Sequence, residues 1–137
     1  MNATDAARRW ARAWTEGWEA LDPEPIIACY APDAGLSTQP FREPFRGTDG
    51  VREYVTQALG EEEDPRVWMG EPIVEADRAA ISWWASLRED GADTTLAGTS
   101  MLRFDADGRV IEQWDAWNQL PERRDPPPWS ALHPRDT

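Results

Sequence analysis

The first part of the chain places apolar residues at helical spacing, and the last part places them in alternation with polar ones. Residues 5–20 predict an amphipathic helix, because apolar side chains recur every three or four positions and charged ones lie mostly opposite. The apolar face would carry Trp10, Ala13, Trp14, Gly17, Trp18 and Leu21. We expect this helix to pack on the rest of the domain through that face.

Two shorter helices are expected next. Asp22 can cap a helix over residues 23–30, which would end before Pro32 because the residue preceding a proline avoids the helical region. A Thr-Asp cap precedes a third helix over residues 50–59. The intervening residues 35–47 are expected to be extended and rich in turns.

The second half of the chain predicts an antiparallel meander. Short connections rich in Asp and Gly separate its apolar runs, and such connections are typical of β-hairpins. The expected strands cover residues 66–75, 79–88, 94–104 and 109–118. Helices followed by a meander indicate an α+β fold with the helices on one face of the sheet.

Two polar segments are expected outside the folded core. Residues 61–64 (Glu-Glu-Glu-Asp) predict a solvated acidic loop. Residues 121–137, which include three consecutive prolines, predict a tail after a single domain over residues 1–120. Trp129 is a candidate anchor for this tail.

Composition narrows the class of protein. A chain of 137 residues suits one domain, and a formal net charge of −12 opposes binding to nucleic acid or to anionic membranes. No apolar run approaches the ~20 residues of a membrane span, and no secretory leader is apparent. The single cysteine, Cys29, excludes an internal disulfide, so we expect a cytoplasmic protein. The absence of lysine excludes Schiff-base chemistry through lysine and, with abundant Arg, Ala and Pro, suggests a GC-rich bacterial genome.

The last expected strand contains the candidate chemistry. Alternation places Gln113, Asp115 and Trp117 on one face and Glu112 and Trp114 on the other. If the first face is the interior, Asp115 is a buried acid and the best candidate for catalysis. If that face is the exterior, Asp115 is an ordinary solvated residue. The nine tryptophans leave a similar choice between core packing and the walls of a ligand cavity.

The order of these elements resembles the NTF2-like superfamily, in particular its SnoaL-like members. The likeness rests on the helix pair over residues 7–30, the segment 41–47 before the third helix, and the strand pair that leads to Glu112-Gln113-Trp114-Asp115. It implies a cone-shaped fold, in which three N-terminal helices pack in a curved antiparallel sheet and leave a cavity at the wide end.

The resemblance also separates the chemistries known in the superfamily. Trp10, Ser100 and Thr38 occupy the positions that carry the catalytic groups of ketosteroid isomerases, so that mechanism is rejected. The Asp–Arg–Asp set of limonene epoxide hydrolases is incomplete, and His133 is the only histidine available for a scytalone dehydratase site. The polyketide cyclase pattern remains, and in it an Asp on the last strand, here Asp115, is the general acid/base.

The same alignment implies which residues surround the ligand. Burial among apolar side chains would raise the pKa of Asp115, as a general acid/base near neutrality requires. The implied ligand-binding residues are Trp10, Trp14, Tyr30, Thr38, Trp83, Ser100, Gln113 and Trp117. Neither a metal nor a cofactor is expected. Trp84 and Trp114, with Trp68, would lie exposed on the convex face and form a homodimer there, as is common in this superfamily.

Three hypotheses about function therefore stay open. The first is a cofactor-independent cyclase or isomerase that acts on a small hydrophobic, carbonyl-bearing molecule through Asp115. The second is a non-catalytic ligand-binding or scaffold module. The third is a partner-binding protein whose tail, residues 121–137, docks elsewhere.

Overall fold

The computed structural model describes residues 1–130 and residue 132. The helices and strands of this part are α1 (Ala3–Ala20), α2 (Glu24–Ile27), β1 (Tyr30–Ser37), β2 (Phe45–Arg46), α3 (Gly47–Leu59), β3 (Glu62–Met69), β4 (Ile73–Glu75), β5 (Arg78–Glu89), β6 (Ala92–Phe104) and β7 (Val110–Leu120). The α+β class is thus confirmed. Helices occur in all three expected regions, but α2 is a single turn that ends at Ile27, earlier than the helix expected over residues 23–30. No helix of the described residues is long and apolar enough to span a membrane.

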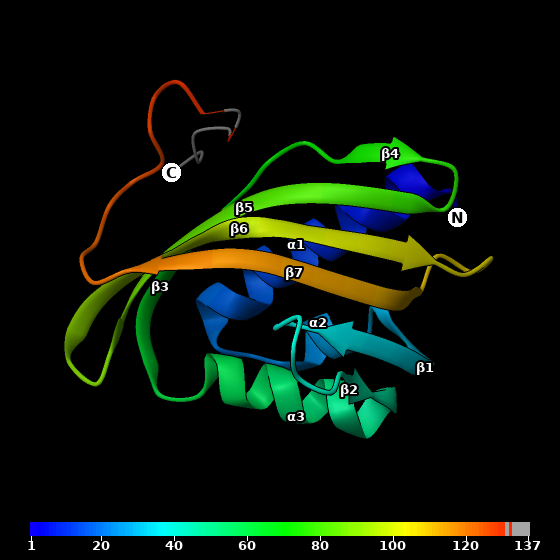
Figure 1. Cartoon of the computed structure of the whole chain (residues 1–137), viewed down its shortest axis with the longest axis horizontal. Coiled ribbons are helices and arrows are strands. Elements are labelled where there is room, and N and C mark those ends of the chain that lie inside the picture. Colours follow the sequence, from blue (N-terminus) through cyan, green and yellow to red (C-terminus); the bar gives the residue numbers. More distant parts are fainter. Residues whose placement is uncertain (131, 133–137) are drawn as a thin grey trace.

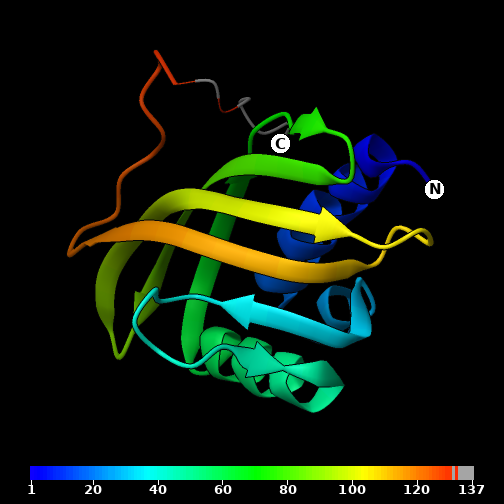
Figure 2. The same cartoon turned by 45° about the vertical axis from the view of Figure 1, so that its right-hand side comes forward.

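The strands form one curved, mixed sheet in the order β2-β1-β7-β6-β5-β3, with β4 paired to β5 (Figures 1 and 2). Most neighbouring strands are antiparallel, but β1 pairs with β7 in parallel. The expectation of a purely antiparallel sheet is therefore wrong. Residues 30–37, expected as the end of a helix and the start of an irregular segment, form β1 instead, with a register shift between Tyr30 and Gly35.

Helix α1 begins and ends with ordinary capping interactions. The Asn2 side chain accepts a hydrogen bond from the Asp5 backbone N–H (2.8 Å), and Leu21 closes the helix in the left-handed conformation. Gly17 is required by the fold, because a Cβ there would lie 2.8 Å from the Asp22 carbonyl oxygen and 2.9 Å from Ile26 Cγ1. The missing side chain thus lets α2 pack directly on α1.

The tryptophans of α1 pack in a row on the sheet face that we call the inner face. The ring centroids of Trp10 and Trp14 are 6.0 Å apart, those of Trp14 and Trp18 5.8 Å, and those of Trp18 and Trp83 6.0 Å. Residues four apart on a helix lie one above the other, so the spacing in sequence produces this row. Trp83 of β5 extends the row onto the sheet.

The expected hairpins are confirmed between β5, β6 and β7. Asp90 and Gly91 both have positive φ (52° and 77°), as the type I′ turn of a two-residue hairpin requires. The expected strand over residues 66–75 is divided into β3 and β4, with Pro72 between them. Strand β3 begins earlier than expected, at Glu62, so the prediction of a solvated acidic loop is wrong for this residue, which is buried.

The C-terminal segment runs from the end of β7 toward β5 on the opposite, outer face of the sheet (Figure 2). Trp84 Nε1 donates to the Arg124 carbonyl oxygen (2.6 Å), and the Arg123 guanidinium donates to the Asp64 carboxylate (3.1 Å) and to the Ser86 carbonyl oxygen (3.0 Å). Trp129 is 86% exposed, so the expected anchor is wrong. Arg123 and the backbone hold the segment instead.

The outer-face tryptophans differ in exposure. Trp114 is 48% exposed, as expected, whereas Trp84 is half-buried and meets the C-terminal segment. Trp68 is buried, contrary to expectation, and the Arg66 guanidinium lies over its ring at 5.3 Å from the centroid. The homodimer through this face stays a prediction. His133 lies outside the described residues.

Candidate active site

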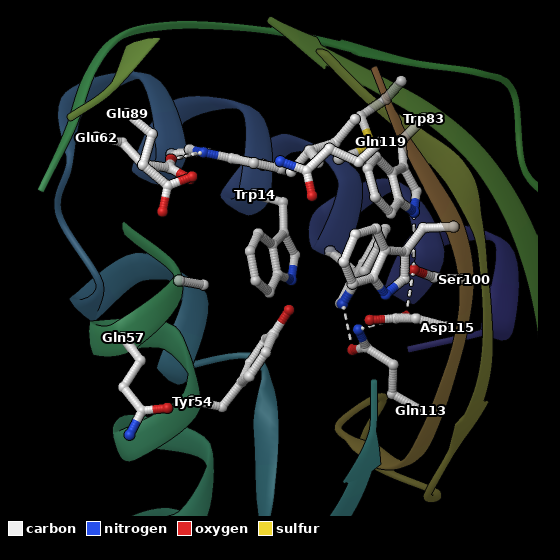
Figure 3. A pocket seen from close by; sticks show the side chains of 16 residues that line it. Trp14, Tyr54, Gln57, Glu62, Trp83, Glu89, Ser100, Gln113, Asp115 and Gln119 are labelled. Atoms are coloured by element: carbon white, nitrogen blue, oxygen red, sulfur yellow. Dashed lines mark hydrogen bonds between the residues drawn. The ribbon is translucent and has the colours of Figure 1, made fainter. Parts of the chain in front are cut away.

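A cavity of about 290 Å³ lies between α1, α3 and the inner face of the sheet (Figure 3). Its lining combines aromatic walls with a few acids and amides. The lining residues are Trp10, Trp14, Trp18, Tyr54, Gln57, Ala58, Glu62, Met69, Trp83, Glu89, Leu96, Ser100, Gln113, Asp115, Trp117 and Gln119. Its volume is at the lower end of the range for small-molecule sites, which supports a compact ligand.

Six of the eight implied ligand-binding residues line the cavity: Trp10, Trp14, Trp83, Ser100, Gln113 and Trp117. The other two, Tyr30 and Thr38, are not among the lining residues and lie behind it. The Tyr30 hydroxyl is hydrogen-bonded to side chains of the cavity wall, and the Thr38 carbonyl oxygen accepts a hydrogen bond from Trp117 Nε1 (2.9 Å). Both residues therefore position the wall.

Asp115 points inward from β7, so the first of the two alternatives for this strand, in which Asp115 is a buried acid, is the correct one. The exposed fraction is 6% for Asp115 and 2% for Gln113 on the same face. Cross-strand register pairs Asp115 with Ser100 of β6 and pairs Ser100 with Ile81 of β5. Side chains directly opposite each other in a sheet lie close together, so this register brings Ser100 to the Asp115 carboxyl group.

Two hydrogen bonds hold the Asp115 carboxyl group, and both end on Oδ1. Ser100 Oγ donates at 2.6 Å, and Gln113 Nε2 donates at 3.0 Å. Trp83 Nε1 in turn donates to Ser100 Oγ (3.0 Å), which directs the Ser100 proton toward Asp115. Within residues 1–130, no group donates to the second oxygen, Oδ2, so this oxygen is free to meet a ligand.

The orientation of the Gln113 amide is set from behind. An indole N–H can only donate, so the Gln113 atom that faces Trp10 Nε1 (3.2 Å) must be the amide oxygen. The Tyr30 hydroxyl donates to the same oxygen and accepts from Trp10 Nε1 and Trp14 Nε1, each at 3.1 Å. The amide NH₂ is therefore turned toward Asp115.

Burial decides the protonation behaviour of this site. It raises the pKa of Asp115 to about 6, although the hydrogen bonds from Ser100 and Gln113 favour the charged form and oppose this rise. Burial also raises the pKa of Tyr30 well above its usual value, so the Tyr30 hydroxyl keeps its proton and its role as a donor. Asp115 can thus lose and regain a proton near neutral pH.

A second acid, Glu62 of β3, lines the cavity away from Asp115 (Figure 3). Glu62 is 9% exposed, and its Oε1 accepts a hydrogen bond from Trp18 Nε1 at 2.7 Å. Burial, together with the nearby charge of Glu89, raises the pKa of Glu62 to about 7 against the lowering effect of the Trp18 bond. Glu89 is the cross-strand partner of Glu62 and is exposed, as are the lining residues Gln57 and Gln119, so these side chains mark the mouth.

The sequence pattern missed Glu62 and Tyr54. A register shift between Glu63 and Arg66 interrupts the alternation of β3, so counting back from Val67 gives no sign that Glu62 points inward. Tyr54 lies on the apolar face of the expected third helix, and this was the available signal. Figure 3 shows its hydroxyl pointing into the cavity between the two acids. Burial raises the pKa of Tyr54, and the charges of Asp115 and Glu62 add to this rise.

No group of His, Cys, Asp or Glu side chains in the described part of the chain has the arrangement needed to hold a metal ion. Cys29, buried behind the cavity near Pro25, is a free thiol whose pKa is raised by burial. It does not line the cavity.

A curved sheet that covers a long N-terminal helix and encloses an apolar cavity with a polar floor defines a member of the NTF2-like superfamily. A family model described as a SnoaL-like domain matches residues 9–113, and the chain therefore belongs to the SnoaL-like family. The match extends from α1 into β7 and ends just before Asp115. Among curated proteins, none matches the sequence.

Proposed function

We propose that this protein is a small-molecule enzyme that performs cofactor-independent acid/base chemistry, of the cyclase or isomerase type, with Asp115 as the general acid/base. The substrate is a small hydrophobic molecule with a carbonyl group. The single observation that carries the proposal is the Asp115 carboxyl group, which is buried in a cavity, bonded on one oxygen only and has a pKa of about 6.

The first step is removal of a proton from the carbon next to the substrate carbonyl. Ionised Asp115 accepts this proton on Oδ2, and the C–H bonding electrons become the double bond of an enolate. Negative charge then develops on the substrate oxygen. The Tyr54 hydroxyl lines the cavity and has no hydrogen-bond partner among the described residues, so it is the donor available to this oxygen.

The second step returns the proton. In an isomerisation, protonated Asp115 delivers it to a different carbon of the enolate. In a cyclisation, the enolate carbon bonds to a second carbonyl carbon of the same molecule, and Asp115 protonates the resulting alkoxide. Asp115 is ionised again at the end of either sequence, as a catalyst must be.

The bonds to Oδ1 support this division of roles. Ser100 and Gln113 hold the carboxyl group in one orientation, so Oδ2 faces the ligand without rotation of the side chain. The buried indoles of Trp10 and Trp83, with the partly exposed Trp117, offer flat surfaces to an apolar substrate. Catalysis therefore depends on one reactive oxygen whose surroundings are fixed in advance.

The experiment is hydrogen–deuterium exchange at the acidic carbon of small ketones, such as 2-tetralone and 1-indanone, followed by NMR in D₂O. Binding is first measured from tryptophan fluorescence, because five of the lining residues are tryptophans. For each ketone that binds, the wild type should accelerate exchange and Asp115→Asn should not. Equal exchange rates for the two proteins would refute the proposed catalysis.

The second candidate is a non-catalytic ligand-binding protein. It is favoured by the lining itself, which contains no arginine or histidine among the described residues to stabilise a developing oxyanion. This reading predicts that ketones bind to the wild type and to Asp115→Asn with different affinity at most, and that neither protein accelerates exchange.

A further inference from the structure

The cavity contains acids but no basic side chain in the lining that the structure describes. Its described lining includes Asp115, Glu62 and Glu89, and no lining residue is an arginine or a histidine. The chain contains 14 arginines and no lysine. In the described residues, arginines form ion pairs with acids outside the cavity, for example with Glu24, Asp64 and Asp105. The acids of the cavity therefore have no cationic partner in the part of the chain that the structure describes.

Glu62 is the acid for which this matters most. It is nine-tenths buried, and Trp18 Nε1 satisfies only Oε1 (2.7 Å). Glu62 lines the cavity, and no group within residues 1–130 donates a hydrogen bond to its second oxygen, Oε2. Burial of a carboxylate without a cation is costly, so a positive group brought by a ligand would stabilise the charged form of Glu62.

The walls beside Glu62 suit a positive group as well. Trp14 and Trp18 meet edge to face at an interplanar angle of 71°, and Trp18 meets Trp83 at 60°. All three indoles line the same cavity as Glu62. The electron-rich face of an indole attracts organic ammonium groups, and cages of several aromatic rings with an acid are a recurrent solution for binding them.

We propose that the ligand of this cavity is a small organic cation, a hydrophobic molecule whose protonated or quaternary amine lies against Glu62 and the indoles of Trp14 and Trp18 while its other end meets Asp115. This inference deepens the proposed function by naming the substrate class, and it rests on that proposal for the reaction at the Asp115 end. An anionic ligand is disfavoured, since the cavity acids and the net charge of −12 would both repel it.

The test compares three ligands of similar size: benzyltrimethylammonium, its neutral carbon isostere neopentylbenzene, and the anion phenylacetate. Dissociation constants are measured from tryptophan fluorescence at low ionic strength and checked by calorimetry. We expect the wild type to bind the cation about tenfold or more tightly than the isostere, and the anion most weakly. Equal binding of the cation and the isostere, or tighter binding of phenylacetate, would overturn the inference.

Charge-removing variants locate the preference. Glu62→Gln keeps an acceptor for Trp18 Nε1 and removes the charge, so it should lose most of the preference for the cation while binding of the isostere is unchanged. Glu63→Gln is the matched control, because Glu63 is the next residue of β3 and is exposed. If Glu62→Gln does not fold by circular dichroism, Glu89→Gln replaces it and should lose a smaller part of the preference. Full retention of the preference in a folded variant of Glu62 would refute the assigned position.

The same measurements separate this inference from the proposed catalysis. Asp115→Asn should abolish ketone exchange and keep most of the preference for the cation. A wild type that exchanges ketones through Asp115 but binds the isostere as well as the cation would sustain the proposed function and refute the cation. A protein that prefers the cation but does not accelerate ketone exchange would support the cation as ligand and refute the proposed catalysis.

Discussion

The two acidic ends of the cavity share burial and differ in what surrounds the acid. At the deep end, Asp115 receives two hydrogen bonds on one oxygen, and burial still raises its pKa to about 6. Near the mouth, burial raises the pKa of Glu62 to about 7 against one hydrogen bond from Trp18, and the charge of the neighbouring Glu89 adds a smaller rise. Burial is the main cause of the raised pKa at both acids, and hydrogen-bond donors oppose it at both: two donors at Asp115 and one at Glu62. Only Glu62 has a nearby like charge that adds to the rise.

This difference indicates different roles. A network that reaches from Trp14 through Tyr30 and Gln113 to Asp115 fixes the orientation of one carboxyl group, as proton transfer requires. Among the described residues, the acids at the mouth have no comparable network, and they share the cavity lining with several aromatic rings. The deep end thus has the features of a reaction site, and the mouth has those of a recognition site.

The largest effect is expected at the deep end. Asp115→Asn should lower the rate of ketone exchange by about 10²–10⁴-fold, with little change in binding, because the amide cannot accept and return the proton. Glu112→Gln is the control, since Glu112 lies on the outer face of β7 and pairs with Arg103 (3.2 Å). A similar loss of rate in both variants would show that the charge of β7, and not the acid in the cavity, is responsible.

Ser100→Ala tests the donors that limit the pKa at the deep end. The variant removes a donor to Asp115 and the acceptor of Trp83 Nε1, so it should lower the free energy of unfolding by about 1–3 kcal/mol. It should also raise the pKa of Asp115 and move the pH dependence of exchange upward. Ser82→Ala, on the exposed face of β5, is the matched control and should change neither quantity. An unchanged pH profile in Ser100→Ala would remove the hydrogen bond from the account.

Glu62→Gln tests the cost of charge near the mouth. The pKa of Glu62 in the folded protein, about 7, lies above its ordinary value of 4.5, so the folded state binds more protons between these values. The stability from this group is complete below about pH 4.5 and is lost as the pH rises through about 7. The wild type should therefore lose free energy of unfolding between pH 4.5 and pH 8 that Glu62→Gln does not lose. The difference in free energy of unfolding between the variant and the wild type should change by on the order of 2 kcal/mol in favour of the variant. Denaturant unfolding at the two pH values measures this change, and an equal pH dependence in both proteins would contradict the burial of the charge.

Glu89→Gln should have the smallest effect. Glu89 is exposed, and its charge is the last of the causes that change the pKa of Glu62. Its removal should lower the pKa of Glu62 by roughly a few tenths of a unit, because solvent screens charges at the surface. NMR titration of the Glu62 carboxyl carbon measures the change. A rise in this pKa would mean that Glu89 does not act through its charge.

Local patterns predict much of this fold. The helical spacing of Trp10, Trp14 and Trp18 gives α1 and its buried face, and the Asp90-Gly91 turn gives the β5–β6 hairpin. Alternation along β7 places Asp115 and Gln113 on one face, and the resemblance to SnoaL-like proteins implies that this face is the interior. These features depend on residues close together in the chain.

The features that local patterns miss depend on residues far apart in the chain. β1 pairs with β7 across about eighty positions, and the exposed Pro32 in its middle is typical of an irregular segment. Glu62 points inward only because β3 changes register before Arg66. The role of Tyr30 behind the wall, and of Arg123 on the outer face, arises when distant elements meet. Tertiary contacts of this kind override local propensity.

The most direct test of the central claim is the pH dependence of ketone exchange in the wild type and in Asp115→Asn. If Asp115 is the base that removes the proton, the wild-type rate should rise with pH through an apparent pKa near 6 and level off above it, and the variant should show no such rise. A rise of the same size and midpoint in both proteins would mean that a group other than Asp115 accepts the proton, and would contradict the account.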